Sequence, residues 1–259
     1  MIKHQILLSS SYSEGTRICL DFPDCDQAVV KDAIDRINMA YDGKAVYFST
    51  HTVHTDSADW SSVVEKDPYF DDVRVIGTVD DFVMMIQKDR YLVGLDVAKY
   101  ILSKQSCTHT RIQKLTYMCY ADYLCKTGDR LFVDNIYAFE HGPVIDSVYQ
   151  ALRDHSKEHP AEPIDSDKMI SRMDLLAQIR SRILFAEDGE EKLRSIEETL
   201  KKYDPISTDN LVKITHSKQS PWDVTCERAH ERHDAHIYLT MEDDDIRTYH
   251  HNEGPHPVS

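Results

Sequence analysis

The stretch THTRIQKLTYMCYADYLCKTG, residues 108–128, decides how this chain is organised. Thr108 is a suitable N-cap and Gly128 a suitable C-terminal stop, so the segment between them predicts one long helix. Apart from Asp122, residues 116–125 are apolar or aromatic nearly all round that helix. A helix with this pattern is buried on every side, so we expect it at the centre of a helical domain.

Helical signals continue on both sides of this segment. Short extended runs at 131–132 and 136–139 precede Gly142 and Pro143, which we expect to turn the chain into a helix, because proline is well suited to a first helical turn. Ser220, Pro221 and Trp222 fit the first positions of a later helix, with the Trp222 ring directed into the core. The other expected helices are 95–104, 167–186, 189–203, 208–216 and one that follows Thr240.

The first 94 residues alternate between strand and helix patterns. We expect strands at 2–9, 17–22, 44–50 and 73–78, helices at 27–40 and 80–88, and a long loop at 52–72. On the first helix, Asp26 is the expected N-cap and the inward face is Val29, Ala33, Ile37 and Ala40. The predicted fold class is therefore mainly α: a helical domain at 95–250 with a short β element, a small α/β accessory unit at 1–94, and a flexible tail at 251–259.

Four separated motifs are similar, in order and spacing, to the Panacea (SocA-like) antitoxin domain. They lie at 110–117, 128–132, 136–149 and 211–222, so the resemblance covers about residues 95–250. It implies the antitoxin of a type II-like toxin–antitoxin pair, of the kind linked to phage defence. Such an antitoxin neutralises a protein toxin from an adjacent gene, often a translation inhibitor, by direct binding. At positions 140–141 this chain has Glu140 and His141, where the family commonly has a tyrosine or lysine.

Tyrosines suit a recognition module because they are large, have few rotatable bonds and carry a polar tip. The same rings also suit the core of a small helical domain. The turn at 140–144 fits either an exposed contact loop or a tight connector. The partner-binding candidates are Tyr117, Tyr137, Glu140, His141, Gly142, Pro143 and Tyr149, and the structural candidates are Leu115, Gly128, Pro221 and Trp222.

Charge bears on the class of partner. The formal net charge is -15, with 9 basic against 16 acidic residues in 1–94 and 21 against 29 in 95–259. Such a surface repels phosphate backbones, so a nucleic-acid ligand is disfavoured, although a DNA-binding regulator of its own operon remains the alternative function. An acidic surface favours a basic protein partner.

No run approaches 18 apolar residues, so we expect no membrane segment and a cytoplasmic location. In that compartment we expect the cysteines to be reduced. A homo-oligomer is compatible with these expectations.

Histidines raise the possibility of a metal-dependent hydrolase. His230, His233 and His236 are spaced three apart, with His250, His251 and His256 further on. Zinc needs three or four converging ligands, and this spacing alone does not supply them. Cys107 or Ser220 could be paired with His109 or His216, but no nucleophile motif surrounds either. We therefore expect no enzyme activity, metal or cofactor.

Overall fold

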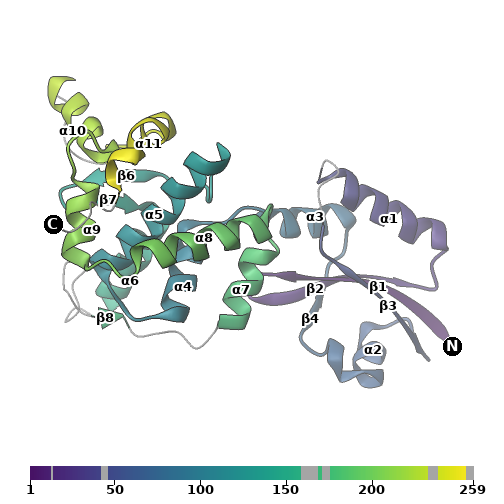
Figure 1. Cartoon of the computed structure of the whole chain (residues 1–259). Helices are drawn as coiled ribbons and strands as arrows, with labels where there is room; N and C mark the ends of the chain where they lie inside the picture. The colour runs from purple at the N-terminus through teal and green to yellow at the C-terminus, as the bar shows by residue number, and fades with distance from the viewer. Residues whose placement is uncertain (13, 42–45, 159–168, 171–175, 233–238, 255–259) are drawn as a thin grey trace. The chain divides into compact units, whose positions relative to one another are not determined.

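The computed structural model describes residues 1–12, 14–41, 46–158, 169–170, 176–232 and 239–254. The chain forms two compact units (Figure 1). Unit 1 comprises residues 1–91 and 185–187, and unit 2 comprises 92–184 and 188–259. The fold is mainly α with an N-terminal α/β unit, which confirms the predicted fold class.

Unit 1 is built on a four-stranded sheet in the order β3-β1-β2-β4. The strands are β1 (Ile2–Ser11), β2 (Thr16–Pro23), β3 (Ser49–Thr55) and β4 (Val73–Val75). β1 pairs antiparallel with both β2 and β3, whereas β2 pairs parallel with β4. The helices are α1 (Gln27–Met39), α2 (Trp60–Lys66), η1 (Pro68–Phe70) and α3 (Val79–Lys88).

Both faces of this sheet are covered, because successive side chains of β1 point to opposite sides. Leu7 packs in one core with residues of α1 and α3, whereas Ile6 and Leu8 pack in a second core with residues of α2 and η1. Figure 1 shows α1 and α3 on one side of the sheet and α2 on the other. Unit 1 is therefore a three-layer structure with its sheet buried in the middle.

Three details of the prediction for unit 1 are wrong. The strand expected at 44–50 is instead β3 at Ser49–Thr55, where pairing with β1 sets its position, and the described residues 46–48 are not in a strand. The segment 52–72 is not a loop, because it holds most of β3 together with α2 and η1, anchored by the buried side chains of Val63 and Phe70. On α1 the buried residues are Val30, Ala33 and Ile37, and Val29 is exposed. The Asp26 N-cap is confirmed, since its side chain accepts a hydrogen bond from the amide of Ala28.

Unit 2 is built around α5 (His109–Thr127), the long helix predicted from residues 108–128. Thr108 caps its start by accepting from the amide of Arg111, and Gly128 ends it with a φ of 82°. Leu115 and most other side chains of α5 are buried, as expected. The helices in contact with α5 are α4 (Gly94–Lys104), α6 (Asp146–Glu158), α8 (Gly189–Tyr203), α9 (Thr208–Thr215) and α11 (Asp243–Tyr249).

The remaining elements lie around this centre. They are β5 (Cys107–Thr108) paired with β8 (Met169–Ile170), β6 (Ile136–Phe139) paired with β7 (Gly142–Ile145), and the helices α7 (Leu176–Leu184), α10 (Pro221–Arg232) and η2 (His250–Glu253). In Figure 1, β6, β7, α9, α10 and α11 gather at one end of unit 2. That end carries the candidate site.

Three predictions for the elements of unit 2 are wrong. The helix expected at 167–186 is only α7 at Leu176–Leu184, because residues 169–170 form strand β8 by pairing with β5. Gly142 and Pro143 do not begin a helix, because they belong to strand β7, and α6 starts only at Asp146. The flexible tail does not begin at 251, because residues 250–253 form η2 and the Glu253 side chain is completely buried. The rest of the expected tail, residues 255–259, lies outside the described part of the chain.

Candidate functional site

Polar side chains of α5 hold strand β7 in place. The side-chain oxygen of Gln113 accepts a hydrogen bond from the amide of Ile145 at 2.9 Å, and the Lys114 ammonium donates to the carbonyl of Pro143 at 3.1 Å. Both side chains are buried. Two consecutive polar residues inside the apolar helix are therefore explained by the backbone groups of β7, which need partners when they are buried.

Strands β6 and β7 form a hairpin whose two-residue turn is Glu140 and His141. Side chains from outside the hairpin contact two backbone carbonyls at this turn. Trp222 Nε1 donates to the carbonyl of Phe139 at 2.7 Å, and His216 Nε2 lies 3.2 Å from the carbonyl of Glu140. The His216 and Trp222 rings also contact each other, with centroids 4.1 Å apart. The turn is thus exposed in its side chains but restrained in its backbone.

The outer edge of β6 is paired as well. The amide of Ala138 donates to the carbonyl of Leu239, and the amide of Met241 donates to the carbonyl of Ile136, both at 2.8 Å. Tyr137 and Thr240 form an isolated antiparallel bridge between these two bonds. A covered edge offers no free backbone for strand addition, so the hairpin can contact a partner through its side chains and its turn.

Gly142 is required where the hairpin meets α5. Its φ is +94°, a conformation that residues with a Cβ rarely adopt. A Cβ at this position would lie 2.8 Å from Lys114 Nζ, 2.8 Å from His216 Cε1 and 3.0 Å from Thr215 Oγ1. The glycine therefore allows the hairpin to approach the buried lysine.

A pocket of about 480 Å³ opens beside the hairpin turn. Glu140 and His141 stand at its edge, and Tyr149 and Phe139 form part of its wall, with their rings edge to face and centroids 5.3 Å apart. Gln113 and Lys114 also line it. The pocket joins an exposed turn to a wall of aromatic and polar groups, an arrangement common in binding sites.

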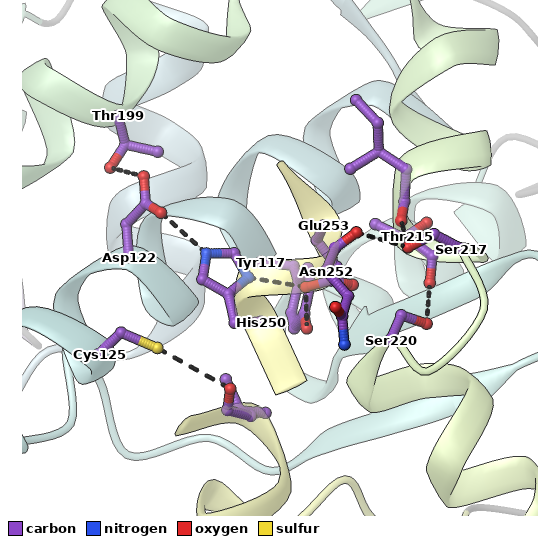
Figure 2. Close-up of polar contacts among 12 residues, drawn as sticks. Tyr117, Asp122, Cys125, Thr199, Thr215, Ser217, Ser220, His250, Asn252 and Glu253 are labelled. Atoms are coloured by element: carbon purple, nitrogen blue, oxygen red, sulfur yellow. Dashed lines mark hydrogen bonds and ion pairs between the residues drawn. The ribbon is translucent and has the colours of Figure 1, made fainter. Parts of the chain in front are cut away.

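A buried network of charged groups ties the end of the chain to α5 (Figure 2). The Tyr117 hydroxyl donates to Glu253 at 2.8 Å, and the Glu253 carboxylate lies 2.7 Å from Nδ1 of His250. On the other side of that ring, Nε2 lies 2.8 Å from Asp122, whose other oxygen accepts from Thr199 at 3.0 Å. Three elements, α5, α8 and η2, are therefore coupled through side chains that are buried except for the half-buried Asp122.

The network shifts the pKa of its members. Burial lowers the pKa of His250, but hydrogen bonds to Asp122 and Glu253 outweigh this effect and raise that pKa to about 9. Burial raises the pKa of Glu253, opposed by His250 and Tyr117. Burial lowers the pKa of Lys114 to about 7, although the nearby Glu253 opposes the change. Because each ring nitrogen of His250 faces a carboxylate, the protonated ring with two N–H donors satisfies both.

Two serine hydroxyls of the loop between α9 and α10 fasten that loop to η2 and to the end of α9. Ser217 donates to the carbonyl of Asn252 at 2.9 Å, and Ser220 donates to the carbonyl of Thr215, also at 2.9 Å (Figure 2). The oxygen of Ser220 accepts in turn from the amide of Asp223, which confirms it as the N-cap of α10. Pro221 is buried directly after it.

The structure separates the predicted contact residues into two groups. Glu140 and His141 are exposed, and Tyr137 and Tyr149 are half-buried. Tyr117 is fully buried and bonded to Glu253, while Gly142 and Pro143 are buried within the hairpin, so a partner cannot reach these three. Trp222 is half-buried rather than in the core, because its ring lies against the outer side of the turn.

The sequence did not single out Gln113, Lys114, His250 or Glu253 for these roles. Gln113 and Lys114 were visible only as two polar residues inside the 110–117 motif. His250 and Asp122 are 128 residues apart, and their pairing follows only from the three-dimensional fold.

Catalytic and metal alternatives gain no support from the geometry. Burial raises the pKa of Cys107 to about 11, which opposes the thiolate that nucleophilic attack requires, and the Ser220 hydroxyl is engaged as a helix cap. Within the described residues, no three His, Cys, Asp or Glu side chains are grouped to hold a metal ion. His233, His236 and His256 lie outside those residues.

The hairpin lies within a segment of the chain that matches a known family model. Residues 112–223 match the family model described as antitoxin SocA-like, Panacea domain, which confirms the resemblance seen in the sequence. The matched segment runs from α5 through the hairpin to the start of α10. Neither the curated proteins nor the solved structures gave a match. Across the described residues, no helix is long and apolar enough to span a membrane.

Proposed function

We propose that this protein is an antitoxin that binds and neutralises a cognate protein toxin in the cytoplasm. The observation that carries the proposal is the antitoxin-domain match over residues 112–223, because it contains the exposed turn and every lining residue of the pocket beside it except His109 and Thr110. We also propose that the toxin is encoded by an adjacent gene.

The contact surface in this proposal is the turn of Glu140 and His141 together with the mouth of the adjoining pocket. Bonds from Trp222 and His216 hold the backbone of the turn before any partner arrives. A restrained turn loses little conformational entropy on binding, so more of its contact energy contributes to affinity. The half-buried ring of Tyr149 supplies an apolar wall against which a toxin side chain can pack.

The negative charge of this chain favours a toxin with a basic surface. The chain has a formal net charge of -15, and the pocket mouth includes Glu140 and Asp209. Opposite charges across an interface speed association and disfavour wrong partners. A basic toxin would meet this mouth with its lysines or arginines close to the two carboxylates.

The test is co-expression with the product of the neighbouring open reading frame. We expect that product to arrest growth when expressed alone, and the two proteins to purify together with growth restored. A neighbour that is harmless alone, or a toxic neighbour that is neither bound nor neutralised, would contradict the proposal.

A further inference from the structure

A second pocket, of about 400 Å³, lies in unit 1 and is lined largely by aromatic rings. Three of these rings are within reach of a ligand from solvent, since Tyr47, Tyr69 and Phe185 are 51%, 52% and 45% exposed. Tyr12, Tyr41 and Phe48 complete the aromatic lining. So many partly exposed rings around one hollow are unusual in a protein surface and indicate a binding site.

The rings support one another. Phe185 stacks with Tyr12 at a centroid distance of 5.8 Å and meets Tyr47 nearly edge to face at 5.1 Å. Aromatic faces carry negative charge density and attract cations, arginine in particular. The chain already uses this attraction here: the Cζ atom of Arg17 lies 4.4 Å from the centre of the Tyr69 ring, and that of Arg90 lies 5.5 Å from the centre of Tyr41.

A carboxylate stands among these rings. Asp89 lines the pocket, is 6% exposed, and is fixed by accepting a hydrogen bond from the amide of Tyr12 at 2.7 Å. Arg17 also lines the pocket, but its charge is balanced by an ion pair with Asp72. Residues 1–91 carry 9 basic and 16 acidic side chains, so the surroundings favour a cation as well.

We propose that this pocket binds an arginine side chain of a basic protein partner. The flat guanidinium would lie against the rings while its N–H groups hydrogen-bond to the Asp89 carboxylate, a combination of stacking and forked donation that lysine does not provide. This inference goes beyond the proposed function, because every lining residue of this pocket except Phe185 lies outside the residues that match the antitoxin family. It gives the accessory unit a binding role of its own.

The test is an NMR titration of the isotope-labelled full chain with two blocked tripeptides, acetyl-Gly-Arg-Gly-amide and its citrulline counterpart. Citrulline has the shape of arginine without its charge. We expect the arginine peptide to shift resonances of the pocket residues and to bind at least about tenfold more tightly than the citrulline peptide, about 1.4 kcal/mol. Asp89→Asn, which keeps an oxygen for the Tyr12 amide, should abolish that preference, and Tyr47→Leu should weaken binding of the arginine peptide.

Tyr91→Leu is the matched control, because Tyr91 is 47% exposed and does not line the pocket. It should bind the arginine peptide as the wild type does. Equal binding of the two peptides, or an unchanged preference in a folded Asp89→Asn protein, would overturn the proposal. A lysine peptide that binds as tightly as the arginine peptide would overturn the assignment to arginine. None of these results depends on the toxin. The arginine site can therefore be refuted while the antitoxin function is supported, and the antitoxin function can be refuted while the arginine site is supported.

Discussion

The position of Gly142 makes a quantitative prediction about how the hairpin sits on α5. Gly142→Ala must place a residue with a Cβ at a φ of +94°, and its new methyl group would lie 2.8 Å from both Lys114 Nζ and His216 Cε1. Left-handed backbone costs a residue with a Cβ about 1–2 kcal/mol, and overpacking a filled site costs about 1–3 kcal/mol more. We therefore expect a loss of roughly 2–5 kcal/mol in the free energy of unfolding of unit 2.

Gly128→Ala is the matched control, because Gly128 has a φ of +82° and no atom within 4 Å of an added Cβ. Its cost should be the backbone contribution alone, about 1–2 kcal/mol. Urea denaturation followed by tryptophan fluorescence measures both, in a Trp60→Phe background so that Trp222 in unit 2 is the reporter. If the two substitutions cost the same, Gly142 has room around it and the close seating of the hairpin on Lys114 is refuted.

Three further predictions concern the buried network and the turn. The pKa of His250 is raised from 6.5 to about 9, so its contribution, on the order of 3 kcal/mol, is complete below pH 6.5 and lost as pH rises through 9. The difference in free energy of unfolding between wild type and His250→Gln should therefore shrink between pH 6.5 and 9. Lys114 makes the stability of both proteins rise with pH, and this contribution cancels in the difference. A difference that does not change with pH would contradict the ion pairs of His250. Trp222→Phe removes the indole donor to the carbonyl of Phe139 and should cost about 1 kcal/mol in urea denaturation followed by circular dichroism, because this variant lacks the fluorescent reporter of unit 2; no change would show that this bond is not formed. Tyr117→Phe removes a donor from the buried Glu253 carboxylate and should cost about 1–3 kcal/mol; a neutral effect in the same assay would argue against that hydrogen bond.

Local signals in the sequence were sufficient for most helices. The capping residues Asp26 and Thr108 act on amides two or three positions away, so the starts of α1 and α5 could be predicted. The helix expected at 80–88 was predictable as α3 for a similar reason: its buried residues Phe82, Met85 and Ile86 follow a 3.6-residue period, which is a local property of the sequence.

The errors arose where distant pairing decides the structure. Pro143 is acceptable at the start of a helix and also in a short strand, and only pairing with Ala138 selects the strand. The turn of Glu140 and His141 lacks the Asn-Gly or Asp-Gly pair that announces a hairpin in a sequence. Tyrosine is a residue type that suits an interface anchor, but Tyr117 is fully buried in the core of unit 2.

The candidate site was predictable only in part. Glu140 and His141 could be proposed because residues 140–144 follow an extended run and are recognisable as a turn. The pocket beside them also needs Gln113, Tyr149 and Asp209, which come from three different helices. Side chains that converge from separate elements leave no spacing rule in the sequence, so such a pocket becomes visible only in the structure.

The measurement that tests the central claim most directly is the affinity of the purified toxin for Glu140→Lys, compared with wild type and with Glu198→Lys. Glu198 is an exposed acid on α8 away from the pocket, so the control makes the same charge reversal elsewhere. Calorimetric titration should show a loss of affinity of at least about tenfold for Glu140→Lys and little change for Glu198→Lys, with both melting temperatures near that of the wild type. Wild-type affinity in a folded Glu140→Lys protein would contradict the account and place the toxin on another surface.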